Sequence, residues 1–296
     1  MRRAICTMIF GAAALAAWSV PVRAQKQGQI FVSLTTPDGK PVDGLTAEEV
    51  MIQEDGMPCK VIKVESVAWP TKVQVLVDNG RANTNPINPL QNGLKEFFAL
   101  MPEGTEMSLY ATAGSPRPIV KPTRDRQKLV DGIALITPDN GSGIFFDALF
   151  EASERVDKDK TPSHNIIVMI ASDSGQMRAN DRDVQKLQQN IYNHGITTHI
   201  MMNVTGQGAG GQVDFGINIA KFSRGRYETL NSATRLATLI PDVGKTVAKA
   251  IALQNQQYRV TYERPAKAKE QGGAIGLQVR REGVVHVSMR GNQVPD

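Results

Sequence analysis

The sequence predicts an α/β protein in which a doubly wound, mostly parallel sheet is inserted into a β-sandwich formed by the N- and C-terminal strands. The α/β part is predicted by short apolar runs rich in β-branched residues, which alternate with stretches of helical periodicity. The sandwich is predicted by clean apolar/polar alternation near both ends of the chain, which is typical of antiparallel strands with one wet face. Three strands at each end are too few for a stable unit, so we expect them to pair with each other.

The chain opens with a candidate secretory leader. Two arginines precede an apolar stretch at residues 4–20, and a small-x-small cleavage pattern ends at Ala24. We expect a signal peptide at residues 1–24, cut after Ala24, and a secreted or periplasmic protein. A membrane anchor is the alternative, but the apolar stretch is short and alanine-rich for a span, which needs about 20 strongly apolar residues. We therefore predict no membrane span after cleavage.

Charge and cysteine content exclude some classes of protein. The chain has a formal net charge of +5, and three of its positive charges are leader arginines, which leaves +2 after cleavage. No Lys/Arg cluster with interleaved aromatic residues appears, so nucleic acid is not an expected partner. Cys59 is the only cysteine after the leader, so an intramolecular disulfide is excluded and the core must supply the stability. The role of Cys59 stays open.

The first segment after the leader, residues 25–70, reads as β-structure. Residues 29–36 alternate between apolar and polar and end at a Pro-Asp-Gly turn. Residues 50–54 and 60–67 form two more strands, joined by a turn containing Gly56. We place a boundary at Trp69-Pro70, because proline cannot donate to a strand ladder.

The middle segment, residues 71–256, alternates strands and helices, which indicates a parallel sheet covered on both faces. Proline at the first helical position and an aspartate cap mark two of the helix starts. In order, we expect a strand at 72–77, a helix from 88, a strand at 107–113, a helix after Asp125, a helix after the loop 137–143, a strand at 164–171, a helix from Asp181, a strand at 196–204, a short helix at 217–222, a short strand at 226–229 and a helical stretch at 236–251 with a kink or fresh start at Pro241.

The last segment, residues 257–296, returns to a period of two. Its apolar positions lie two residues apart in three runs, beginning at Tyr258, Ile275 and Val285. We expect these strands to pair with residues 25–70.

Two acids end the buried strands of the middle segment. Asp78 follows the strand 72–77, and Asp173 follows the strand 164–171. Since the carboxyl ends of neighbouring parallel strands meet at one edge of a sheet, the two side chains should lie close together there. Two close carboxylates favour a divalent cation or a shared proton.

The pattern resembles the von Willebrand factor type A (VWA) domain, and in particular the VWFA-related family of secreted bacterial proteins. The resemblance implies a Rossmann-like α/β fold, a non-enzymatic role and protein–protein binding in adhesion or assembly. It covers nearly all of the chain after the leader and is carried by five stretches: VSLTTPDGKPVDGLTAEEV with QEDG, VQVLVDNG, GSGIFFDAL, IIVMIASDSG and YRVTYERP.

The family's metal-ion-dependent adhesion site (MIDAS) combines an Asp-x-Ser-x-Ser motif, a threonine and a second aspartate. Asp78 and Asp173 match the two aspartates, but Gly80 and Ala82 replace the serines and Gly143 replaces the threonine. The resemblance therefore implies a degenerate site, because Mg²⁺ demands near-octahedral oxygen coordination. We predict no cofactor.

A weak Mg²⁺ site remains the alternative, with Ser142 as the third ligand beside the two aspartates. Asn79, Asn83 and Thr84 also offer oxygens on the same loops. In this alternative the protein is a Mg²⁺-dependent adhesion module.

Without the ion, binding of a so far unidentified protein partner would rest on the loops at the carboxyl ends of the strands. These loops are residues 78–85, 137–143, 173–177 and 206–211. The residues that we predict to contact the partner are Asn79, Arg81, Asn83, Asn140 and Ser174.

Other chemistries receive less support. Gly206-x-Gly208-x-x-Gly211 has the spacing of a dinucleotide fingerprint, but residues 212–216 separate it from the predicted helix. A phosphohydrolase that uses Asp78 as nucleophile is the enzymatic alternative, although glycine stands two residues later, where such enzymes carry a second acid. The four histidines are scattered without the spacing of a zinc site.

Overall fold

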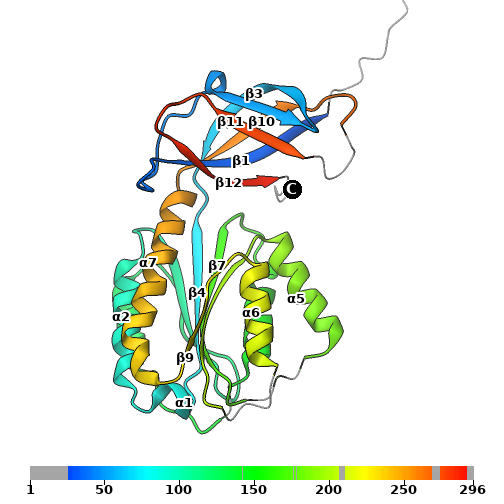
Figure 1. Ribbon diagram of the computed structural model, residues 1–296. Coiled ribbons are helices and arrows are strands. Elements are labelled where there is room, and N and C mark those ends of the chain that lie inside the picture. Colours follow the sequence, from blue (N-terminus) through cyan, green and yellow to red (C-terminus); the bar gives the residue numbers. More distant parts are fainter. Residues whose placement is uncertain are drawn as a thin grey trace, which may run out of the picture.

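The computed structural model describes residues 26–141, 143–175, 177, 179–206, 211–268 and 274–291, with the side chains of 286–291 left out (Figure 1). The predicted leader at residues 1–24 and the predicted metal ligand Ser142 lie outside the described residues. Among the described residues, no helix is both long and apolar enough to cross a membrane.

The α/β part is built on a six-stranded sheet. Its strands, in spatial order, are β6 (Arg117–Thr123), β5 (Glu106–Ala111), β4 (Thr71–Val77), β7 (His164–Ser172), β8 (Thr197–Asn203) and β9 (Tyr227–Leu230). All are parallel except the edge strand β6, which is antiparallel to β5. The sequence did not predict β6, because Pro118 and Pro122 interrupt it. Its place at the sheet edge is where proline is tolerated.

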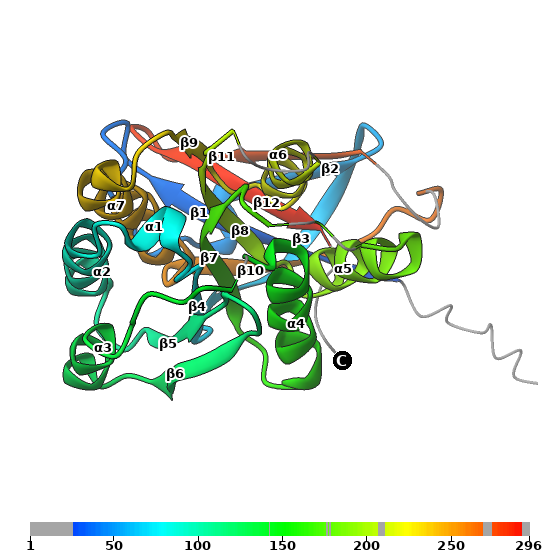
Figure 2. The ribbon, with the colours of Figure 1, turned by 90° about the horizontal axis from the view of Figure 1, so that it is seen from below.

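Helices cover both faces of this sheet (Figure 2). One face carries α2 (Asn88–Leu100), α3 (Arg126–Ile133) and α7 (Leu236–Gln254), whose apolar sides form one buried cluster with the sheet. The other face carries α4 (Phe145–Lys158), α5 (Asp181–Asn193) and α6 (Gln212–Phe222), which form a second cluster. The doubly wound architecture is therefore confirmed.

Three local predictions differ from the structure. Helix α6 begins at Gln212, directly after Gly211, so the expected separation of the glycine motif from the helix is wrong. Helix α7 runs without a break through Pro241 and follows a short 3-10 turn, Ala233–Arg235. A single-turn helix, α1 (Arg81–Thr84), follows β4 where only a loop was expected. A four-residue helix shows too little periodicity to be read from sequence.

The two ends of the chain pair, as predicted. They form a single six-stranded antiparallel sheet of order β11-β2-β3-β10-β1-β12, which curves into a half-barrel around its own apolar cluster and replaces the two packed sheets of the expected sandwich. Its N-terminal strands are β1 (Gln27–Thr35), β2 (Val50–Glu54) and β3 (Met57–Val67), and its C-terminal strands are β10 (Gln257–Glu263), β11 (Ile275–Val279) and β12 (Val285–Gly291). At the end of β2, buried Glu54 accepts hydrogen bonds from Arg264 at 2.5 to 3.1 Å.

The antiparallel sheet joins the α/β part at the amino ends of the parallel strands. Strand β3 leads into β4, and α7 leads into β10, so two chain crossings connect the parts (Figure 1). The ring of Trp69 packs between Phe31 and His164, with centroid distances of 5.1 and 5.4 Å. The Ser33 hydroxyl adds a 3.0 Å hydrogen bond to the carbonyl of Leu253. The carboxyl ends of the parallel strands are thereby left at the opposite end of the molecule.

Candidate binding rim

The two predicted acids follow neighbouring strands, at the carboxyl ends of the parallel strands. Strands β4 and β7 pair in parallel, with Val77 opposite Ile170, and the backbone N–H of Asp78 donates to the carbonyl of Ile170 at 2.8 Å. Asp173 follows Ser172, the last residue of β7. This arrangement follows from two apolar runs that are buried on both faces and therefore occupy the centre of the sheet.

Asp78 is enclosed by the protein. Its side chain is 1% exposed. One carboxylate oxygen accepts the Gly80 N–H at 2.9 Å, and the other accepts the hydroxyl of Ser172 at 2.5 Å. Ser172 in turn lies 2.7 Å from the hydroxyl of Ser174. Burial raises the pKa of Asp78, and the hydrogen bonds from Ser172 and Gly80 partly oppose this rise.

Asp173 faces a different loop. One of its carboxylate oxygens accepts the backbone N–H and the hydroxyl of Thr205, at 2.7 and 2.6 Å. The other accepts the N–H of Gly206 at 3.2 Å. Asp78 therefore binds groups on its own loop and β7, while Asp173 anchors the loop after β8. Each carboxylate has protein donors of its own.

Glycines let the loops close on Asp78. A Cβ atom at Gly143 would lie 2.5 Å from a carboxylate oxygen of Asp78, and one at Gly80 would lie 2.9 Å from the other oxygen. The backbone of Gly175 packs so tightly on the carbonyl of Gly143 that any side chain at 175 would collide with it. At positions 80 and 143, where the resembled site carries hydroxyls, the carboxylate of Asp78 thus occupies the space that a side chain would need.

The described residues do not fit a magnesium ion. Mg²⁺ needs about six oxygens in a near-octahedral shell. Here the oxygens of Asp78 and Asp173 point at N–H and O–H donors, and the described part of the chain holds no group of three or more His, Cys, Asp or Glu placed to share a metal. Ser142 cannot enter this test, because it lies outside the described residues.

Asn79 holds three loops together. Its side-chain N–H donates to the carbonyl of Thr137 at 2.8 Å, and its side-chain oxygen accepts the N–H of Ala113 at 3.1 Å. Its backbone carbonyl accepts the N–H of Asp139 at 2.9 Å. Asn79 therefore ties the loops after β4 and β5 to the loop that precedes α4. Such a network of buried hydrogen bonds fixes loop geometry.

The predicted contact residues divide into two groups. Asn79 and Asn83 are completely buried; the amide of Asn83 donates to the carbonyl of Asp78 at 3.2 Å. Arg81 and Asn140 are exposed and bond to each other at 3.0 Å, and Ser174 is half-buried. A partner can therefore reach Arg81, Asn140 and Ser174, while the two buried asparagines support them. We call Arg81, Asn140 and Ser174 the rim.

Two residues that matter here were not identified from the sequence. Ser172 was read only as the residue between the predicted strand 164–171 and Asp173, and Thr205 was not considered. The signal for Ser172 was a hydroxyl at the end of an apolar run, next to an acid. No local signal marks Thr205, because its contact with Asp173 joins loops 32 residues apart.

No family model matches the sequence, and no curated protein matches it either. Solved structures do resemble this one. A von Willebrand factor type A protein from Catenulispora acidiphila superposes with a TM-score of 0.52 at 9% identity, covering 91% of this chain and 74% of that one. The chain therefore has the fold of a von Willebrand factor type A domain protein, and at this identity the likeness concerns the fold alone.

Two further solved structures are similar to this one. They are the pilus adhesin SpaC from Lactobacillus rhamnosus GG (TM-score 0.49, 9% identity, 84% of this chain and 45% of that one) and the vWF domain of the type V pili tip protein Mfa5 from Porphyromonas gingivalis (TM-score 0.47, 12% identity, 62% and 97%).

Proposed function

We propose that this chain is a secreted protein-binding module whose rim contacts another protein without a metal ion. The observation that carries the proposal is the network around Asn79, which joins three loops beneath the exposed pair Arg81 and Asn140. A surface held in its binding conformation before contact loses less conformational entropy on association. Secretion is supported by the leader pattern at residues 1–24.

Independence from metal is supported by the contacts of the two acids. In the resembled site a partner's carboxylate completes the metal shell. Here protein donors already meet Asp78 and Asp173. An arginine can take the place of the metal ion, because its planar guanidinium can bind a partner's carboxylate directly. Arg81 is the exposed cation of the rim.

The enzymatic alternative has less support. A nucleophile must touch its substrate. The carboxylate of Asp78 is enclosed between Gly80 and Ser172 and is 1% exposed. Turnover of generic phosphate esters that disappears in Asp78→Asn would nevertheless establish this activity.

The test is a pull-down from the native envelope fraction with matched charge variants. Arg81→Glu should lose the captured partner, whereas Lys121→Glu, on the edge strand β6, should retain it. EDTA should have no effect on capture. If EDTA released the partner, the Mg²⁺-dependent adhesion module would replace this proposal, and equal capture by both variants would exclude the rim as the contact surface.

A further inference from the structure

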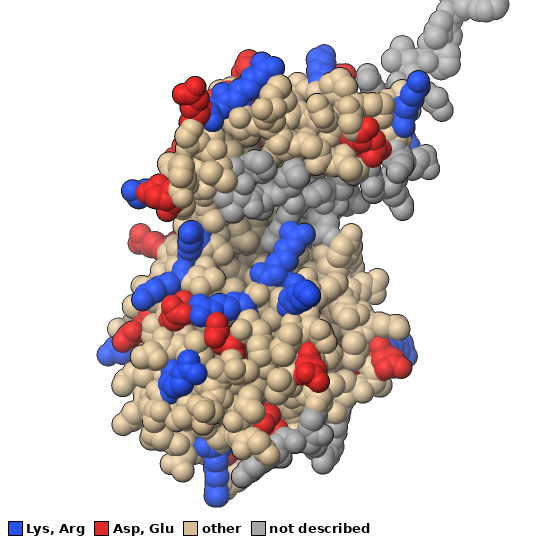
Figure 3. Space-filling model, in the orientation of Figure 1, with Lys and Arg blue, Asp and Glu red and all other residues tan. Residues whose placement is uncertain are grey.

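A cluster of basic side chains lies on one side of the α/β part, away from the rim. Figure 3 shows Lys and Arg below the antiparallel sheet, over the region where Figure 1 shows α7, β9 and α6 from left to right. We name this surface the basic face. It is defined by Lys221 on α6, Arg224 and Arg226 in the connection to β9, and Lys245 and Lys249 on α7. Three of these cations lie in residues 221–227 with two aromatic residues, so the expectation that the sequence holds no such cluster is wrong.

One arginine organises the basic face. The guanidinium of Arg226 lies 2.6 Å from a carboxylate oxygen of Glu228 and 2.7 Å from one of Asp242 on α7. It also donates to the hydroxyl of Thr246 at 3.3 Å. These contacts tie the start of β9 to the exposed side of α7. Arg226 with the two carboxylates carries a net charge of 1 − 2 = −1, so the basic face as a whole carries 4 − 1 = +3.

The other four cations are not neutralised in this way. Lys221, Arg224, Lys245 and Lys249 are exposed, and none makes an ion pair with a residue that the structure describes. The two lysines of α7 are four residues apart and so project from the same side of the helix. Four like charges on one surface repel each other, and an anionic partner would relieve that repulsion.

Backbone strain and exposed apolar groups add to the cations. Arg224 has a φ of +58°, a conformation that normally favours glycine, and the N–H of Gly225 closes the end of α6 on the carbonyl of Ala220 at 2.8 Å. The chain thus places an arginine where glycine would be free of strain. Beside it, Phe222 is 47% exposed, and Ile217 on α6 is 41% exposed.

We propose that the basic face binds a membrane surface that contains anionic phospholipids. Lysine is depleted in protein–protein interfaces, whereas lysines with one or more exposed aromatic side chains are typical of segments that lie on anionic bilayers. Three of the four free cations are lysines, and Phe222 directly follows Lys221 in α6. Figure 2 shows α6 and β9 reaching about as far out on this side as the antiparallel sheet, so the face is broad enough to meet a flat surface.

This proposal goes beyond protein binding at the rim. The rim lies at the carboxyl ends of the parallel strands, whereas the basic face lies along the side, near their amino ends. A molecule attached through the basic face would keep the rim exposed. The two proposals can therefore fail separately.

The experiment is co-sedimentation with vesicles of phosphatidylcholine alone or with 30 mol% phosphatidylglycerol, a content that is roughly that of a strongly anionic bilayer. Both sheets are built from residues after Gln25, so the protein used runs from Gln25 to Asp296 and lacks the apolar stretch of the leader. Each basic residue near an anionic surface contributes about a fivefold increase in partitioning. Lys245→Gln with Lys249→Gln should therefore lower partitioning about 25-fold.

The matched control is Lys121→Gln with Lys128→Gln, which changes the net charge equally on β6 and α3, on the other side of the molecule. It should bind like the unaltered chain. Phe222→Ser should weaken binding without changing its dependence on salt, because it removes apolar contact and no charge. Circular dichroism would verify that each variant is folded.

Three results would overturn the proposal. The first is equal binding to neutral and anionic vesicles. The second is an equal loss in the two double variants. The third is binding to polyglutamate but not to anionic vesicles, which would assign the basic face to an acidic protein partner instead.

Discussion

A side chain at Gly143 would strike the carboxylate of Asp78: its Cβ would lie 2.5 Å from one carboxylate oxygen and 3.0 Å from the carboxyl carbon. In the resembled site a threonine at this position supplies a metal ligand. Here the carboxylate of Asp78 occupies that space and is itself buried. The same substitution that removes a hydroxyl therefore also allows the loop to pack on Asp78.

Gly143→Ala should destabilise the protein. The added methyl must displace a buried carboxylate or a loop, and overpacking of this kind costs about 1–3 kcal/mol. The measurement is urea unfolding. Gly276→Ala is the matched control, because its nearest neighbour, the Cβ of Gln53, would be 3.8 Å away, an ordinary contact. Equal stability of the two variants would mean that the loop adjusts freely around Asp78.

A divalent metal ion should not bind between Asp78 and Asp173 at the carboxyl ends of β4 and β7. We expect no heat when Mg²⁺ or Mn²⁺ is titrated into the protein by isothermal calorimetry, because the oxygens of Asp78 and Asp173 are met by protein donors. Asp78→Ala should give the same flat titration. A heat of binding that vanishes in Asp78→Ala would show that the loops open to form a metal site.

Asp78→Asn should gain stability relative to the unaltered protein as the pH rises. Burial raises the pKa of Asp78 in the folded state. A carboxyl with a raised folded pKa contributes most below its unfolded pKa, near 3.8, and loses that contribution as the pH rises through the folded value. Asparagine does not ionise, so it avoids this loss.

The measurement compares urea midpoints of the two proteins at pH 3.5 and pH 7, roughly below and well above the pKa of an aspartate in an unfolded chain. The difference in unfolding free energy should move in favour of Asp78→Asn at pH 7. A difference that is independent of pH would indicate that Asp78 has the same pKa in the folded and unfolded chains.

The strands at the centre of the sheet could be read from sequence, but the closure of the site could not. β4 and β7 are buried on both faces, so their local apolar composition is enough to predict them and the acids that follow. The edge strand β6 contains two prolines, and only its pairing with β5 makes it a strand. Likewise Asn79 looked like a surface residue, and its burial depends on carbonyls and amides from loops 34 to 58 residues away.

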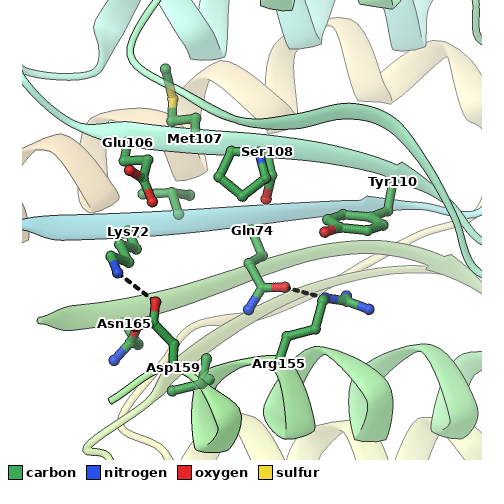
Figure 4. A pocket seen from close by; sticks show the side chains of 12 residues that line it. Lys72, Gln74, Glu106, Met107, Ser108, Tyr110, Arg155, Asp159 and Asn165 are labelled. Carbon is green, nitrogen blue, oxygen red and sulfur yellow. Dashed lines mark hydrogen bonds and ion pairs between the residues drawn. The ribbon is translucent and has the colours of Figure 1, made fainter. Parts of the chain in front are cut away.

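Asp159→Asn should weaken the junction of β4 and α4. The ammonium of Lys72 lies 2.5 Å from a carboxylate oxygen of Asp159 (Figure 4). The hydrogen bond from Lys72 and the N–H of Thr161 lower the pKa of Asp159 to about 2. The Asp159 side chain is 39% exposed, so screening by solvent limits the expected loss at pH 7 to about 0.5 kcal/mol.

The sign of the pH dependence is opposite to that of Asp78. A depressed pKa contributes stability above the unfolded value, near 3.8, and this contribution is lost as the pH falls through about 2. Urea unfolding of Asp159→Asn should therefore differ from the unaltered protein at pH 7, and the difference should shrink toward pH 2.5, roughly the lower end of that window. A difference that does not change with pH would mean that Asp159 has the same pKa in the folded and unfolded chains, so that neither Lys72 nor Thr161 stabilises its charged form.

Arg155→Lys should cost more stability than the same exchange on the surface. The guanidinium carbon of Arg155 lies 4.0 Å from the centre of the Tyr110 ring, and its Nε donates to the side-chain oxygen of Gln74 at 2.8 Å (Figure 4). Lysine can neither stack as a planar group nor keep this directed bond, and the loss should be about 1–2 kcal/mol. The measurement is urea unfolding, with Arg182→Lys on exposed α5 as the control, expected within about 0.5 kcal/mol of the unaltered protein. If the two exchanges had equal effects, Arg155 would stabilise the protein only through its apolar contacts. The planar shape of its guanidinium would then contribute nothing to the free energy of unfolding.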